Sequence, residues 1–150
     1  MADFTYAGTL DGVEATERNF NVASGSAASI DVGDLVLVAN GYAAKMTDGQ
    51  GTAGNLLIGL AQSISTDTAS ADGAVKVLFS TSGLVVRGLA TTAANLTTAV
   101  LFDKVTIDVA AGVQKVDEND AGAIMVWRYP TSTPTTDGIV EVVLPWTLAS

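Results

Sequence analysis

The sequence predicts an all-β fold, a small and mostly antiparallel β-barrel or sandwich with at most one short helix. Its apolar runs are short and rich in β-branched residues, which is typical of strands and not of globular helices. Turn-forming pairs such as Asn40-Gly41 and Ser82-Gly83 separate these runs, as hairpins require. Similar segments also recur along the chain at a constant offset. Whether or not they mark a duplication, closing these strands into a barrel or sandwich removes exposed strand edges.

Composition limits the classes of function. The 150 residues suit one compact domain, which at this length buries roughly 70% of its unfolded surface. The net charge is −9 and the seven basic residues are scattered, so neither nucleic acid nor an anionic membrane is expected as a partner. Cysteine and histidine are absent, which excludes disulfides, thiol nucleophiles, the usual zinc sites and a Ser-His-Asp triad. No cofactor is expected.

The N-terminal segment, residues 1–25, is polar and lacks a repeating apolar pattern. We interpret it as an extended arm or an edge strand, and residues 26–150 as a single β-barrel-type domain. The chain begins without the basic and apolar regions of a signal peptide, and no apolar run reaches the ~20 residues of a membrane span. We therefore expect a soluble protein made in the cytoplasm.

Strand patterns begin at Ile30. Asn40-Gly41 tolerates the positive φ of a tight hairpin, so "DLVLVA" and "YAAKM" are expected to pair. In "NLLIGLAQSI", Gly59 indicates a bulge or a close approach of another backbone. In "DGAVKVLFST" and "LVVRGLA", Lys76 and Arg87 are expected to point outward between apolar neighbours.

Residues 91–102, "TTAANLTTAVLF", form the stretch where a short helix is plausible, because apolar residues recur there at helical spacing. A loop that enters a strand is the alternative interpretation. The remaining apolar runs predict strands, with Pro130 and Pro134 framing a Thr/Ser loop between two of them. These runs are "TAVLFDKVTIDV", "GVQKVD", "GAIMVWRYP" and "DGIVEVVLP".

An internal echo suggests a duplicated β-unit, with a pseudo-repeat covering about 30–88 and 98–145. "GYAAKM" also resembles "GVQKVD", with a small insertion. The alternative is that unrelated strands look similar because β-proteins in general repeat the pattern of a turn followed by an apolar strand. At an offset of 65, residues 72–79 align with 137–144, 56–63 with 121–128, and 35–38 with 100–103.

No residue pattern marks out a catalytic site. Asp117, Glu118 and Asp120 offer hard oxygens to a cation such as Ca²⁺, but they lack the spacing of an EF-hand, and a solvated acidic turn is the alternative. The glycines match neither phosphate-binding loop, and no pair of acids stands out for glycoside hydrolysis. We therefore expect a protein that is not an enzyme.

Large aromatic side chains gather near the chain ends and before the Pro/Thr loop. Trp and Tyr are favoured anchors at protein interfaces, so these residues are candidates for contacts with a partner or a second subunit. Packing of the terminal strands on the barrel is the alternative. The candidates are Phe4, Tyr6, Phe20, Trp127, Tyr129 and Trp146.

The stretch "GDLVLV…NGYAAKM…LLIGLAQSI", followed by "DGAVKVLFSTSGLVVRGLA", resembles the head decoration (capsid-stabilising, or cement) proteins of tailed bacteriophages. The resemblance spans about residues 28–145 and includes the later strands. It depends on short motifs of turn chemistry. The matching positions are Ile30, Gly33, Asp34 and Val36, then Ile58, Gly59 and Ala61, and finally Val85 and Gly88.

The resemblance implies a structural virion protein that binds the outer surface of an expanded capsid as a homotrimer and clamps neighbouring capsomers. Its partners would be the major capsid protein and its own copies, and it would be made in the host cytoplasm. We expect the arm, residues 2–22, to engage the capsid or a neighbouring subunit, and its deletion to abolish binding while leaving the barrel folded. The alternatives are a head-fibre base, a tail protein, or a surface module that binds glycans through Trp127 and Tyr129.

Overall fold

A computed structural model describes residues 2–26, 28–91, 102–129 and 138–147 of the chain. The all-β prediction is confirmed, and the described residues contain strands but no helix. The stretch 91–102, where a helix was plausible, lies outside the described residues except for its two ends. The strands are β1 (Thr5–Thr9), β2 (Thr16–Val22), β3 (Leu35–Ala39), β4 (Tyr42–Lys45), β5 (Ile58–Ala61), β6 (Gly73–Phe79), β7 (Leu84–Leu89), β8 (Lys104–Ala110), β9 (Val113–Glu118), β10 (Ile124–Arg128) and β11 (Ile139–Leu144).

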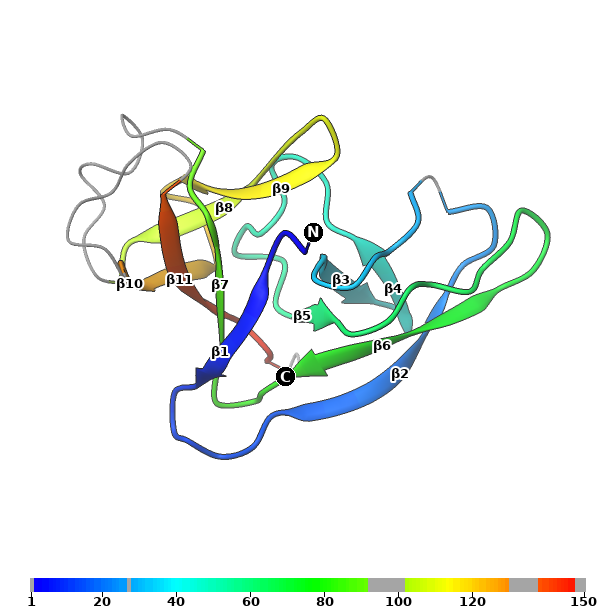
Figure 1. Cartoon of the computed structure of the whole chain (residues 1–150), viewed down its shortest axis with the longest axis horizontal. Helices are drawn as coiled ribbons and strands as arrows, with labels where there is room; N and C mark the ends of the chain where they lie inside the picture. Colours follow the sequence, from blue (N-terminus) through cyan, green and yellow to red (C-terminus); the bar gives the residue numbers. More distant parts are fainter. Residues whose placement is uncertain (1, 27, 92–101, 130–137, 148–150) are drawn as a thin grey trace.

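The strands form two sheets that lie against each other (Figure 1). One is a closed barrel with the order β2-β4-β3-β5-β6, in which β2 and β4 are parallel and the other neighbours are antiparallel. The other is a six-stranded antiparallel sheet with the order β1-β7-β11-β10-β8-β9. Closing a sheet removes its exposed edges, which is how the first sheet protects its backbone groups.

The two sheets repeat one plan, because β2 to β6 and β7 to β11 have the same connectivity and strand order. We call them the first unit (β2–β6) and the second unit (β7–β11). Leu60 pairs with Leu78 between β5 and β6, and the residues 65 positions later, Met125 and Val143, pair between β10 and β11. The parallel pairing that closes the first unit has a counterpart in the second unit, a single parallel bridge between Ala90 and Val116. The registers support a duplicated β-unit.

The hairpin turns of the two units also agree. Asn40 and Gly41 join β3 to β4 with φ values of 52° and 82°, while Ala111 and Gly112 join β8 to β9 with φ values of 53° and 78°. Two central residues with positive φ define the type I′ turn, whose twist matches that of the paired strands. The Asn-Gly hairpin is thus confirmed, and the second turn reaches the same geometry with alanine in the first position.

The limits of the repeat differ from those expected. β7 was assigned to the first copy, yet it pairs with β11 and opens the second unit, just as β2 pairs with β6. The structural counterpart of β3 is β8, which begins at Lys104, so the alignment of residues 35–38 with 100–103 was wrong. β8 is two residues longer than β3, and a single offset cannot align both strand and turn.

The N-terminal residues are integrated into the fold and do not form a separate arm. β1 is the edge strand of the six-stranded sheet, as one of the two interpretations had it. β2, however, pairs along its whole length with β6 inside the barrel. Deleting residues 2–22 would therefore remove a barrel strand, and the expectation that the barrel stays folded without them is withdrawn.

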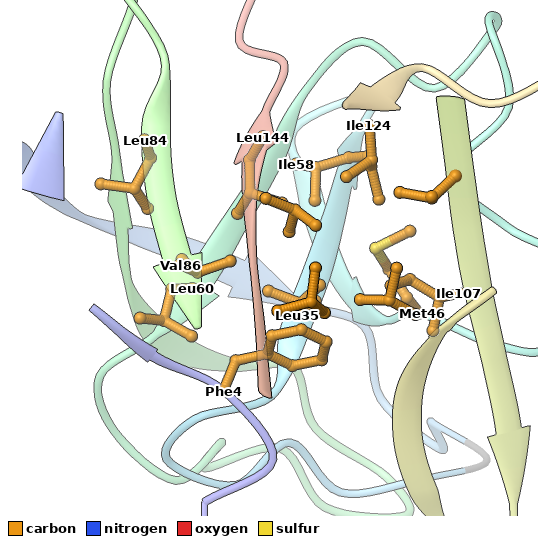
Figure 2. Close-up of a cluster of buried hydrophobic side chains, with 14 of the residues drawn as sticks. Phe4, Leu35, Met46, Ile58, Leu60, Leu84, Val86, Ile107, Ile124 and Leu144 are labelled. Atoms are coloured by element: carbon orange, nitrogen blue, oxygen red, sulfur yellow. The ribbon is translucent and has the colours of Figure 1, made fainter. Parts of the chain in front are cut away.

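One core joins the two units. One cluster of buried side chains contains Val36, Ala61 and Val77 of the first barrel, together with other apolar residues that include Phe79 and Trp146. Leu35, Ile58 and Leu60 alternate with them along β3 and β5 and pack instead among Leu84, Val86, Ile107, Ile124 and Leu144 of the second unit (Figure 2). The core of the second unit therefore contains its own apolar side chains together with side chains of the first unit. The two units form a single domain.

Candidate functional site

The six aromatic candidates divide into buried and exposed residues. Phe4 is 1% exposed and belongs to the core between the units, where its ring covers Gly88 so closely that a Cβ there would overlap it. Trp146 is 9% exposed and stacks on Phe79 at 3.9 Å between ring centroids, with Phe20 beside both rings. Packing on the barrel, the alternative interpretation, thus describes Phe4, Phe20 and Trp146.

Tyr129 is also partly buried and packs against the core between the units. Burial raises the pKa of its hydroxyl to about 12, and the nearby carboxylates of Asp103 and Glu118 add to the rise. The hydroxyl therefore stays protonated at neutral pH, where it can donate a hydrogen bond.

Tyr6 and Trp127 remain accessible, with exposures of 48% and 36%. Trp127 is joined by Phe102, 59% exposed, whose ring meets the indole edge-on at 5.8 Å between centroids. Phe102 has a φ of 69°, a left-handed conformation that costs free energy for a bulky residue and concentrates at functional positions. No sequence pattern marks Phe102 as a candidate, because a single Phe before an Asp indicates neither the positive φ of the residue nor its contact with Trp127.

The outer face of the second unit carries an ion cluster. Arg87 of β7, Glu141 of β11 and Arg128 of β10 lie in one cross-strand row. Arg87 Nη2 and Arg128 Nε donate to the two carboxylate oxygens of Glu141, each at 2.6 Å. Burial by itself raises the pKa of Glu141, but the hydrogen bonds and charges of the two arginines outweigh it, and the pKa falls below its usual value. Glu141 is thus ionised and its charge is neutralised, leaving a net positive charge on this row.

A groove of about 350 Å³ adjoins this row. It is lined by Arg87, Leu89 and Ile139 of the outer face and by the backbone of Gly88 between them. The N-terminal segment and the start of β9 complete the lining, and there the Asp3 carboxylate accepts a hydrogen bond of 2.8 Å from the backbone N–H of Gln114. The lining is mostly apolar, which suits an apolar side chain of a partner more than a polar substrate.

Two further polar residues, Gln114 and Asp34, stabilise the fold through contacts with other segments of the chain. Gln114 of the second unit is buried and reaches the first unit, where its side-chain amide donates to the carbonyls of Leu35 and Met46 at 3.0 Å and its oxygen accepts from the Leu35 amide at 2.7 Å. Asp34, one of the residues of the resemblance, forms an ion pair of 3.2 Å with Lys45. These side chains fasten one segment to another.

The acidic turn shows no arrangement of ligands. Asp120 is exposed, and Asp117 accepts a hydrogen bond of 3.1 Å from the Thr91 hydroxyl. Within the described residues, no group of three or more acidic side chains is placed to hold a metal ion. Nor does this part of the chain contain a helix with the length and apolar character needed to cross a membrane.

Comparison with models of protein families, with curated proteins and with solved structures gives no match for this chain.

Proposed function

We propose that the chain is a structural virion protein that binds the outer surface of an expanded phage capsid as a homotrimer and stabilises it by clamping neighbouring capsomers. The proposal rests on the sequence resemblance to head decoration proteins over about residues 28–145. The structural roles of the resembling residues are compatible with it. Gly33 has a φ of 90° and lies against Ala2, while Gly59 lies under Leu78, whose carbonyl oxygen would be 2.8 Å from an added Cβ. Glycines in such positions constrain the path of the backbone, as motifs of turn chemistry do.

The polar groups of the described residues support a mechanical role. On the outer face of the second unit, Glu141 joins neighbouring strands through hydrogen bonds from Arg87 and Arg128. In the core, Gln114 joins the second unit to the first. A rigid body with its terminal strands fastened down loses little conformational entropy on binding. A ligand that binds only the expanded lattice then stabilises that lattice by mass action.

The test is co-sedimentation of the purified protein with expanded, undecorated phage heads. Saturable binding at a multiple of three copies per lattice repeat supports the proposal, and the heads should then resist heat or chelation better than bare heads. A folded protein that stays in the supernatant at every concentration refutes it.

The exposed pair Trp127 and Phe102 favours a second candidate, a virion module of a head fibre or tail that binds glycans. Aromatic faces bind the apolar faces of sugars, and Arg128 could donate to hydroxyl groups. Glycan titration followed by tryptophan fluorescence tests this candidate, because Trp146 is buried and only Trp127 is accessible. A signal that persists in Trp127→Phe would refute the site.

A further inference from the structure

The outer face of the second unit is basic and apolar on an otherwise acidic molecule. We call this surface the basic face and define it by Arg87, Lys104, Arg128, Met125, Trp127, Ile139 and Phe102. Met125 and Trp127 alternate with buried residues along β10, and Lys104 pairs with Met125 on the same side. Glu141, the carboxylate within this surface, is neutralised by two arginines, and Asp103 lies at its border. The basic face is positive, whereas the chain as a whole carries −9.

The composition of the basic face is that of a binding surface. Tryptophan, methionine and arginine are enriched in protein interfaces, and tryptophan and arginine dominate their binding energy. Trp127, Met125, Phe102 and Ile139 are each large, apolar and exposed. The groove beside Arg87 and Ile139 adds a concave site for an apolar anchor. Together these features point to a protein partner with acidic and apolar side chains.

The loop between β1 and β2 has the complementary character. Val13 is 63% exposed at its tip, Leu10 is also exposed, and Asp11 and Glu14 are the charged residues between the two strands. The loop is ordered, because the Thr9 hydroxyl donates to the Val13 carbonyl at 2.7 Å and the Val13 amide donates to Asp11 Oδ1 at 3.0 Å. The Val13 amide also lowers the pKa of Asp11, so its carboxylate stays charged.

We propose that the basic face of one copy binds the β1–β2 loop of a second copy, and that three copies repeat this contact head to tail in a ring. The two surfaces differ, so the contact is heterologous, and such contacts build closed rings or open chains. Val13 is the apolar anchor, while Asp11 and Glu14 face the arginines and Lys104. The inference rests on the homotrimer of the proposed function and assigns its subunit contact.

Two substitutions separate the two halves of the contact. Trp127→Ser damages the basic face, and Val13→Asp damages the loop without touching its hydrogen bonds. Both side chains are exposed, and the core does not depend on them. Ile64→Ser and Val32→Asp are matched controls, because both residues are exposed and lie on neither surface. Sedimentation equilibrium should give a trimer for the wild type and the controls, and association at least about 30-fold weaker for Trp127→Ser and Val13→Asp.

Mixing the two damaged variants gives a sharper result. Trp127→Ser retains an intact loop and Val13→Asp retains an intact basic face, so one good contact forms between them and the ring cannot close. The mixture should therefore give a one-to-one dimer, with circular dichroism showing that each variant is folded. A wild type that is monomeric or dimeric, or a trimer that neither variant weakens, overturns the inference.

Co-sedimentation with expanded heads keeps this inference apart from the proposed function. If the wild type is a trimer that fails to bind heads, the capsid role fails and the subunit contact stands. If the wild type binds heads but Trp127→Ser and Val13→Asp remain trimeric, the subunit contact fails and the capsid role stands.

Discussion

Replacing Phe4 by alanine should strongly destabilise the protein, although Phe4 is only the fourth residue of the sequence. Its side chain is 1% exposed and belongs to the core that joins the two units. Returning a buried aromatic side chain to water costs about 2–3 kcal/mol, and the cavity that remains brings the total for Phe→Ala to about 3–5 kcal/mol. With a urea m-value of about 2 kcal/mol/M, the unfolding midpoint should fall by about 2 M. Tyr6→Ala, its half-exposed neighbour, should cost below about 1 kcal/mol.

A double-mutant cycle with Gly88 tests the contact itself. Gly88→Ala adds a methyl group where the Phe4 ring lies, and overpacking of this kind costs about 1–3 kcal/mol. In the Phe4→Ala background the ring is gone, so the same methyl group should cost almost nothing. Urea unfolding of the four proteins measures the coupling. A coupling energy near zero, or a cost below about 1 kcal/mol for Phe4→Ala, would refute the burial of Phe4 between the units.

Three further outcomes are expected. Gln114→Ala should cost about 2–4 kcal/mol, because it leaves backbone groups of the first unit unpaired in the core; urea unfolding measures it, and a loss below about 0.5 kcal/mol would contradict the bridge. Glu141→Gln should lower the free energy of unfolding at pH 7. This difference from the wild type should shrink as the pH falls below the ordinary glutamate pKa of about 4.3 and through the lowered pKa of Glu141 in the folded state. A difference that does not change with pH would count against the ion cluster. Burial, followed by a hydrogen bond and the charge of Asp48, raises the pKa of Asp108, so its ionisation opposes folding. Asp108→Asn should therefore raise the free energy of unfolding at pH 7, and with it the melting temperature. The gain in free energy should be below about 1 kcal/mol because Asp108 is partly exposed, and it should vanish near pH 3, where the carboxyl group of Asp108 is protonated in both states.

The two units differ in how they complete their cores. In the first unit β2 supplies Phe20, which meets Phe79 and Trp146. In the second unit the corresponding strand, β7, has Gly88 in its inner row, and the ring of Phe4 occupies that space from another segment. The N-terminal segment is thus needed by the second unit, which explains why β1 pairs with β7.

Local patterns in the sequence were enough to determine the fold class. The Asn40-Gly41 pair specifies a two-residue turn whatever surrounds it, and the alternation around Lys76 and Arg87 specifies which side of each strand faces solvent. These features depend on φ preferences and on the two-residue period of a strand, and both act between neighbouring residues. The echo at an offset of 65 likewise predicted a duplicated unit.

The tertiary structure alone decided which of the large aromatic residues became core and which stayed at the surface. Phe4, Trp127 and Trp146 are all large aromatic residues whose sequence neighbours do not show whether they are buried. In the structure, Phe4 and Trp146 fill spaces left by distant segments, whereas Trp127 has no such space and stays exposed. β7 belongs to the second unit because it pairs with β11, about 50 residues further along the chain. Contacts between residues so far apart in the sequence depend on how well the packed strands fit together in space, and local sequence patterns do not predict that fit.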